Sequence, residues 1–226
     1  MKFTYYGHSC FGLTAGGKNL LFDPFITGNG LAKKIDVNKI PADYILISHG
    51  HGDHMGDAVS IAKRTNATVI CIYEIALWFG AQGHKNYHPM NIGGARQFDF
   101  GKVKMTSAIH SSVLPDGTYA GNPAGFIIEA DSKTIYYAGD TALTMDMKLV
   151  GDYFKVDCAI MPIGDNFTMG VDDAIIASDF VKCNKVIGVH YNTFPPIEID
   201  LEKAKTQFKS KGKQLLLPPI GEQVEL

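Results

Sequence analysis

Cysteine is scarce in this sequence, and no two cysteines have the spacing of a redox or metal-binding motif. The four cysteines of the 226 residues are Cys10, Cys71, Cys158 and Cys183, and no CxxC motif occurs. The last three lie in or beside apolar runs, as small buried residues do in a reducing compartment. The environment of Cys10 stays open, because it lies two residues from His8. The pattern favours buried free thiols over a disulfide framework.

Long apolar runs and clusters of like charge are also missing. No window approaches eighteen consecutive apolar residues, which is about the length that a membrane-spanning helix needs. The first residues enter a predicted strand without an apolar segment or cleavage site, so we expect a cytoplasmic protein. The formal net charge is -2, and no basic run indicates a nucleic-acid surface. We expect a small-molecule substrate and neither a membrane nor a nucleic-acid partner, and we leave a homo-oligomer open.

The composition and pattern that are present predict one α+β domain over residues 1–226. The hydrophobic fraction of 46% and the charged fraction of 19% are those of an ordinary globular protein. Two β-rich halves, each ending in helices and strands, predict two sheets packed face to face with helices outside, a four-layer sandwich. Strands are predicted at residues 3–6, 11–14, 19–22, 44–47, 67–72, 97–98, 103–109, 125–129, 134–138, 158–161, 186–189 and 214–217. Helices are predicted at residues 56–64, 73–79, 145–150, 171–181 and 201–209.

One stretch of the sequence combines three imidazoles and a carboxylate within six positions. Residues 49–54 read His-Gly-His-Gly-Asp-His and follow the predicted strand at 44–47. The glycines disfavour a helix interior, so we expect a tight loop. Nitrogen and oxygen ligands in such a loop suit a divalent cation such as zinc. The alternative, an exposed histidine-rich turn, is disfavoured because the stretch lies in mid-chain directly after an apolar strand.

Three further residues of ligand type lie where predicted apolar strands end. They are His110, Asp140 and His190. Any one of them alone would more often be a structural residue. Together with the histidine-rich loop they predict a dinuclear metal site, because functional side chains concentrate on loops at strand ends.

The order and spacing of these residues resemble the metallo-β-lactamase fold superfamily over nearly the whole chain. The resemblance implies an αββα sandwich with two metal ions at one edge of the sheets. It implies a first ion held by His49, His51 and His110, a second held by Asp53, His54 and His190, and Asp140 as the bridge between them. We expect two divalent ions and zinc as the default, although manganese, iron or nickel suit similar ligands.

Four segments narrow the resemblance to a subgroup of small metal-dependent hydrolases. Residues 7–11, 22–25, 164–170 and 190–194 look like those of enzymes similar to bacterial ascorbate-6-phosphate lactonases. A more remote similarity is to the phospholipase D that cleaves N-acyl phosphatidylethanolamine. The expected activity is attack by a metal-bridging hydroxide on a small ester, lactone or phosphate-containing metabolite. Because the ligand set leaves the site net positive, it suits an anionic substrate group such as a phosphate or carboxylate. Two alternatives stay open: a phosphodiesterase or nuclease of the same fold, and a metal-binding scaffold without turnover.

Some predicted roles concern residues outside the ligand set. The resemblance implies that Asp23 orients the loop histidines. Besides Asp53 and Asp140, His8 is a candidate catalytic residue, as a proton donor or a substrate contact; a structural turn histidine is the alternative. Asp165 and Asn166 are candidates for a substrate-pocket wall.

Two other features of the sequence have structural interpretations. Thr168 or Asp172 is expected to cap the helix at 171–181. His84 and His88 are expected in a surface loop, because Gly83 and Pro89 flank them.

Overall fold

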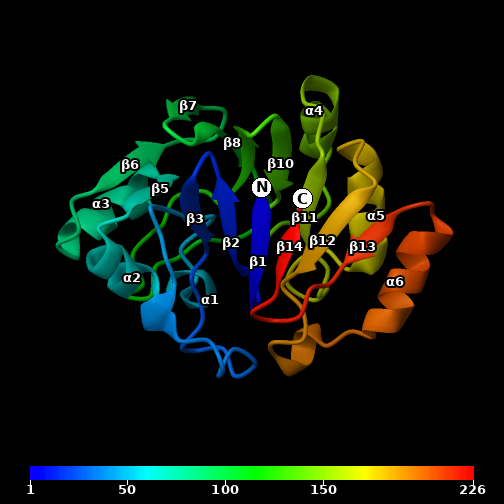
Figure 1. The fold of residues 1–226 in the computed structure, drawn as a ribbon, viewed down its shortest axis with the longest axis horizontal. Helices are drawn as coiled ribbons and strands as arrows, with labels where there is room; N and C mark the ends of the chain where they lie inside the picture. Colours follow the sequence, from blue (N-terminus) through cyan, green and yellow to red (C-terminus); the bar gives the residue numbers. More distant parts are fainter.

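Two seven-stranded mixed sheets form the centre of the fold (Figure 1) in the computed structural model, which describes residues 1–226. The first sheet has the order β14-β1-β2-β3-β4-β5-β6, and the second has the order β13-β12-β11-β10-β9-β8-β7. The strands of the first sheet are β1 Lys2–Gly7, β2 Cys10–Ala15, β3 Lys18–Phe22, β4 Tyr44–Leu46, β5 Thr68–Ile72, β6 Tyr87–Met90 and β14 Gln223–Glu225. Those of the second are β7 Ala95–Phe98, β8 Gly101–Ser107, β9 Ala124–Ala130, β10 Lys133–Tyr137, β11 Cys158–Pro162, β12 Lys185–Val189 and β13 Gln214–Leu216.

Each sheet is antiparallel in one half and parallel in the other. Strands β1 to β3 pair antiparallel, whereas β3 to β6 pair parallel. Likewise β7 to β10 pair antiparallel and β10 to β13 parallel. Parallel neighbours need crossover connections. The loops at their carboxyl ends therefore lie side by side and can bring distant residues together.

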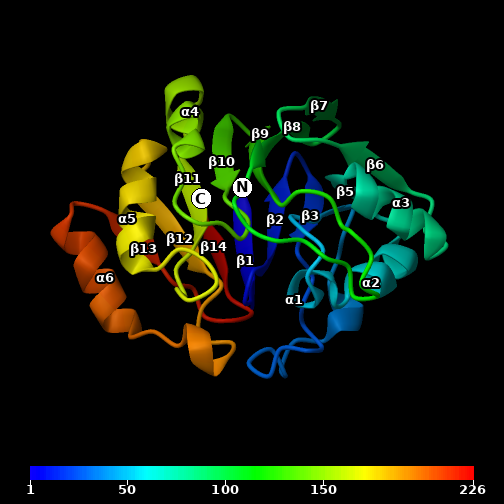
Figure 2. The same ribbon diagram turned by 180° about the vertical axis from the view of Figure 1, so that it is seen from behind.

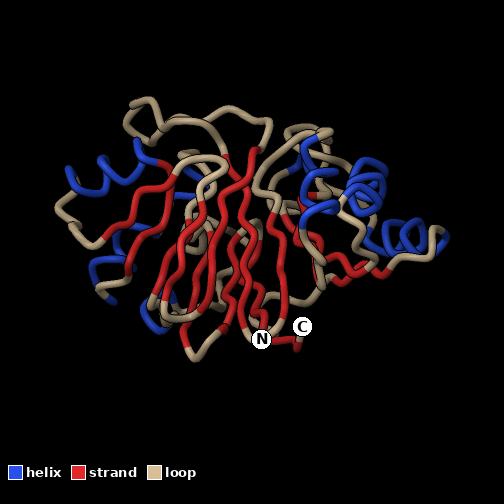
Figure 3. Tube along the Cα trace, turned by 90° about the horizontal axis from the view of Figure 1, so that it is seen from above, coloured by secondary structure: helices blue, strands red, loops and turns tan.

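The helices lie on the two outer sides of the sheets (Figures 2 and 3). Helices α1 to α3 belong to the side of the first sheet and α4 to α6 to the side of the second. Their bounds are α1 Gly52–Met55, α2 Ala58–Thr65, α3 Tyr73–Ala81, α4 Asp146–Tyr153, α5 Val171–Phe180 and α6 Leu201–Ser210, with short 3-10 helices at Val37–Lys39 and Pro195–Ile197. The four-layer α+β sandwich predicted from the sequence is confirmed.

One hydrophobic cluster of 63 buried residues joins the two sheets. Along β1, buried residues alternate with more exposed ones, and the buried Phe3 and Tyr5 belong to this cluster. Every residue of β11, by contrast, is buried. A strand covered on both faces needs no polar alternation, which is why β11 reads as a continuous apolar run. The chain ends meet at the edge of the first sheet, where β1 pairs with β14 (Figure 3).

Several local predictions were wrong, each for a physical reason. The second half of the histidine-rich stretch is one helical turn, α1, and its glycine at position 52 is the first helical residue, where glycine costs little. His88 lies in strand β6 rather than a loop, because Pro89 occupies a sheet edge where no ladder donor is required. His84 is buried, and its Nε2 lies 3.0 Å from the carbonyl oxygens of Ala67 and Asn86.

The start of α5 also differs from the prediction. Gly170, not Thr168 or Asp172, is the N-cap residue, and no side chain caps the helix. The extended backbone of Gly170 lets the chain turn directly into the helix, and Asp172 lies in the first turn, where its charge suits the helix dipole.

None of the helices has the length and apolar character needed to cross a membrane.

All four cysteines are free and buried, Cys10 included. Burial raises the pKa of each thiol, most strongly for Cys10 and Cys71. Since the thiolate is the reactive form, the native protein is expected to react with a thiol reagent such as Ellman's reagent only after unfolding. Release of four equivalents in denaturant and almost none without it would agree with this packing. A rapid native equivalent would show that one of these thiols is accessible.

Candidate metal centre

The structure brings the seven predicted metal ligands together from both sheets. Three overlapping groups of side chains each place their ligand atoms within 4.8 Å of one another. The groups are His49, His51 and His110; His49, His54 and Asp140; and His8, Asp53, His54 and His190. The first sheet supplies residues 49–54 after β4, and the second supplies the other three after β8, β10 and β12. The site therefore lies where loops of the two sheets meet.

The first group has three imidazoles facing one point. The Nε2 atom of His49 lies 2.9 Å from the Nδ1 atom of His51, and both rings pack edge to face with that of His110. His49 is buried, whereas the side chain of His110 is 15% exposed. Burial lowers the pKa of all three histidines, so the neutral imidazoles have lone pairs available for a cation.

Asp140 lies between the two halves of the cluster. Its Oδ2 atom is 3.0 Å from the Nε2 atom of His190, 3.2 Å from that of His54 and 3.8 Å from that of His110. Asp140 is almost fully buried. One carboxylate therefore reaches imidazoles from both predicted halves, as a bridging ligand must.

Asp23 fixes the outer side of the cluster. It is fully buried and accepts hydrogen bonds from the backbone N–H of Ser48 at 2.8 Å and from its hydroxyl at 2.6 Å. Its Oδ2 atom also lies 2.9 Å from Nδ1 of His54 and 2.6 Å from the hydroxyl of Tyr137. Burial and the neighbouring carboxylates raise the pKa of Tyr137, so its hydroxyl stays protonated and donates.

These contacts determine which ring nitrogens carry protons. The hydroxyl of Ser48 donates to Asp23, so its oxygen accepts from Nδ1 of His49 at 3.0 Å. The carboxylate of Asp23 only accepts, so Nδ1 of His54 must donate to it. In the neutral rings, Nε2 of His49 and of His54 are then unprotonated and point inward.

The inward-facing atoms fit a cation and are poorly matched without one. Nε2 of His54 and Oδ1 of Asp140 are buried and have no hydrogen-bond partner. A lone pair of His54 facing a carboxylate oxygen at 3.2 Å requires positive charge between them, either a proton or a metal ion. The donor set of imidazoles and carboxylates suits zinc and other first-row divalent ions.

Metal binding is expected to release protons. Burial opposes a charge on His54, but Asp140 and Asp23 outweigh it and raise the pKa of His54 well above its ordinary value. We therefore expect the metal-free protein to hold a proton on His54 at neutral pH. A cation at Nε2 must displace it, so the apparent metal affinity should rise with pH up to that pKa. Calorimetric titration with zinc in two buffers of different ionisation enthalpy measures this, and zero net proton release would contradict it.

His8 is enclosed rather than open to a substrate. Its side chain has no exposed surface, and its ring nitrogens lie 2.9 Å from Oγ1 of Thr193 and 3.0 Å from Oδ2 of Asp53. Burial lowers the pKa of His8 to about 4. Burial alone would raise the pKa of Asp53, but the hydrogen bond with His8 and the nearby His54 hold it well below its usual range.

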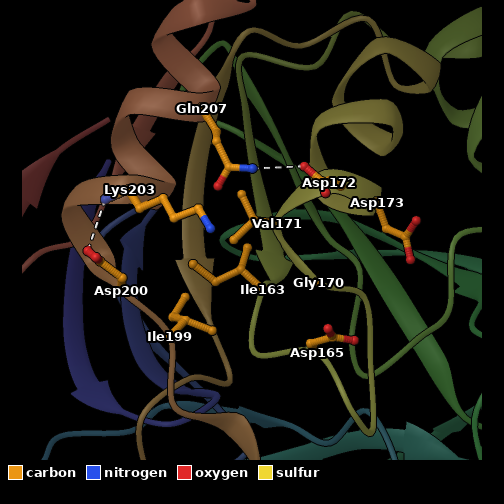
Figure 4. A pocket seen from close by; sticks show the side chains of 10 residues that line it. All are labelled: Ile163, Asp165, Gly170, Val171, Asp172, Asp173, Ile199, Asp200, Lys203 and Gln207. Atoms are coloured by element: carbon orange, nitrogen blue, oxygen red, sulfur yellow. Dashed lines mark hydrogen bonds between the residues drawn. The ribbon is translucent and has the colours of Figure 1, made fainter.

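Asp165 and Asn166 are not brought to the ligand cluster. Asp165 accepts from the backbone N–H of Asn166, and its own N–H donates to Met169 of the same loop. The side chain lines a separate hollow of about 440 Å³ beside α5 and α6, in which no ligand residue takes part (Figure 4). Both residues have left-handed backbones, with φ of 63° and 56°, so the polar loop reflects a tight turn.

Apart from Asp23, sequence reasoning missed the outer partners of the ligands. Each of these residues contacts a partner that is distant in the chain. Ser48 and Tyr137 donate to Asp23, and Thr193 contacts His8. Ser111 likewise places its hydroxyl 3.3 Å from Nε2 of His51. Adjacency to His49 and His110 is a weak signal for the two serines, and nothing in the sequence marks the tyrosine.

A two-sheet αββα sandwich with this cluster between its loops defines a protein of the metallo-β-lactamase fold. Residues 18–191 match the family described as the Beta-lactamase superfamily domain. A UPF0173 metal-dependent hydrolase of Flavobacterium johnsoniae is 56% identical over 226 residues, covering all of both chains. The UPF0173 metal-dependent hydrolase YtkL of Bacillus subtilis is 47% identical over 231 residues, again covering both chains fully. The chain belongs to the UPF0173 metal-dependent hydrolases of the metallo-β-lactamase superfamily.

Solved structures agree with this assignment. Igni18, described as a metallo hydrolase of the archaeon Ignicoccus hospitalis, is 36% identical and superposes with a TM-score of 0.89, over 99% of this chain and 97% of that chain. An isothiocyanate hydrolase from Delia radicum gut bacteria is 20% identical, with a TM-score of 0.81 over 100% and 99% of the two chains. The second likeness shows the fold alone.

Proposed function

We propose that this metal-dependent hydrolase uses two divalent cations, with zinc as the default, to hydrolyse a small uncharged ester or lactone. The position of Asp140 is the observation that supports two cations rather than one. Its Oδ2 atom lies within 3.8 Å of the Nε2 atoms of His54, His110 and His190. Residues His49, His51 and His110 would hold the first ion, and Asp53, His54 and His190 the second. When bound, such ions lower the pKa of a coordinated water and polarise the bond under attack.

The chain's own residues would arrange this chemistry. Asp23 and Ser48 keep the rings of His49 and His54 turned with their Nε2 atoms inward. Substrate would approach from the side on which ligands are accessible, since the Asp53 side chain is 29% exposed and His110 is partly exposed. The buried side, which includes His49 and His54, would exclude bulk water from the inner face.

The loops that follow β8, β10, β11 and β12 favour an uncharged substrate over the anionic one that the charge of the metal ions would suit. Residues 108–123, 139–145, 163–170 and 190–199 contain no Lys or Arg, the side chains that usually hold a substrate phosphate or carboxylate. Backbone hydrogen bonds from Ala142 to Ile109 and from Met169 to Thr141 join three of these loops. Ile109 is 56% exposed and Phe167 55% exposed on them. An apolar acyl or ring group would find contacts there that an anion would not.

A substrate panel with the zinc-loaded protein tests this proposal. It contains nitrophenyl esters of increasing acyl length, simple lactones, nitrophenyl phosphate, bis-nitrophenyl phosphate and, in view of the isothiocyanate hydrolase of the same fold, allyl isothiocyanate. We expect the highest kcat/KM with neutral esters or lactones and loss of turnover after chelation. Preference for the phosphodiester would replace the ester proposal with the phosphodiesterase alternative. A metal-replete protein that turns over nothing would favour the scaffold alternative.

A further inference from the structure

His8 connects two proposed ligands of the second cation that are far apart in the chain. Its ring contacts Asp53, 45 residues away, at 3.0 Å. Its backbone carbonyl accepts the N–H of His190 at 2.9 Å, and the two rings lie with centroids 4.1 Å apart. The same carbonyl accepts the hydroxyl of Tyr5 at 3.0 Å. A shift of His8 would therefore move a carboxylate from one sheet and an imidazole from the other.

The polar contacts of His8 have only one consistent arrangement for a neutral ring. The Asp53 carboxylate can only accept, so Nε2 of His8 must carry the proton. Nδ1 is then an acceptor, and the hydroxyl of Thr193 must donate to it at 2.9 Å rather than to the carbonyl oxygen of Tyr191 at 3.3 Å. Thr193 thus selects the tautomer that Asp53 requires.

Aromatic side chains enclose His8 and shield its polar contacts from solvent. The rings of Phe25 and Phe194 pack edge to face against the imidazole at 5.7 Å and 5.5 Å. The backbone of His8 is left-handed, with φ of 56°, a conformation that its surroundings must stabilise. His8 contacts Oδ2 of Asp53, so Oδ1 of the same carboxylate would be available to the second cation.

We propose that His8 and Thr193 are positioning residues that hold Asp53 for the second cation, and that His8 neither touches the substrate nor transfers a proton to it. This inference rests on the proposed dinuclear site. It resolves the two roles that the sequence left open, since a ring with no exposed side-chain surface and both nitrogens engaged has no free atom for a leaving group.

The test measures zinc affinity by competition with a chromophoric chelator, which separates the two binding steps. Outer partners of metal ligands typically contribute about 10–100-fold in affinity. We expect His8→Ala to weaken the second step by that factor and to leave the first step unchanged. Thr193→Val should act in the same direction. His8→Gln, which keeps a donor toward Asp53, and Thr193→Ser, which keeps the hydroxyl, should lie closer to wild type.

A second readout does not depend on metal or activity. In the metal-free protein, ring ¹⁵N shifts of His8 should report a protonated Nε2 and an unprotonated Nδ1. The opposite tautomer would overturn the proposal even if a variant failed to fold. So would equal loss of both cations in His8→Ala and Thr193→Val, or no loss in either. If wild-type protein itself binds fewer than two zinc ions, it is the proposed function that fails.

Discussion

Replacing Asp140 with alanine is expected to remove at least one of the two proposed cations and to abolish most of the activity. One oxygen of this carboxylate lies between imidazoles of both halves, so no other side chain can take its place. The loss in kcat/KM should exceed the roughly 100-fold upper range for removing an outer partner. Elemental analysis after gel filtration, together with turnover of the best substrate of the panel, measures both effects.

The fold is expected to survive the Asp140→Ala substitution, because the cluster of 63 buried apolar residues holds the sheets together. Circular dichroism confirms folding before metal is counted. Asp173→Ala is a matched control, since this aspartate lies in the first turn of α5 and is exposed. Full occupancy and normal turnover in Asp140→Ala would show that the bridge is assigned to the wrong residue.

Asp23→Ala should be the most destabilising change near the site, even without metal. It removes the shared acceptor of Ser48, His54 and Tyr137 from a fully buried position. Each stranded donor costs about 1–3 kcal/mol, and breaking a buried charged pair costs about 3–5 kcal/mol. We expect a loss of unfolding free energy of about 3–5 kcal/mol. Urea denaturation in EDTA measures it without a metal contribution.

The backbone of Asp23 is left-handed, with φ of 41°, so part of the loss in Asp23→Ala would come from alanine at a positive φ. Asp131→Ala controls for this, because Asp131 has φ of 49° and accepts only surface bonds from Gly16. Asp23→Asn keeps the size and tolerates the conformation, and should cost less than alanine. An equal loss for Asp23→Ala and Asp131→Ala would mean that the buried hydrogen bonds contribute nothing beyond backbone strain.

Much of the sandwich was predictable because its strands have strong local signals. The pattern of Phe3 and Tyr5, and the apolar run at 158–161, gave strands within one or two residues of those observed. Strand β14 was missed because Gln223–Glu225 is short and polar, and it forms only by pairing with β1. Strand β6 was missed because Pro89 reads as a loop signal, although an edge strand accommodates it.

The clustering of the seven predicted ligands could be predicted from residue order and strand ends, but its surroundings could not. His110 and Asp140 each lie three residues past their strand, and His190 one residue past, so strand ends located them. The enclosure of His8 depends on Thr193, 185 residues away. The burial of His84 depends on the carbonyl of Ala67. Such contacts arise only after the sheets have packed, and local sequence does not encode which side chain a distant loop will present.

The most direct measurement of the central claim is anomalous diffraction from crystals grown with zinc, recorded on both sides of the zinc edge. Two peaks are predicted, one among His49, His51 and His110 and one among Asp53, His54 and His190, both in contact with Asp140. A well-ordered protein crystallised in excess zinc with no peak among these side chains, or with a single peak that leaves one of the two groups empty, would contradict the dinuclear site.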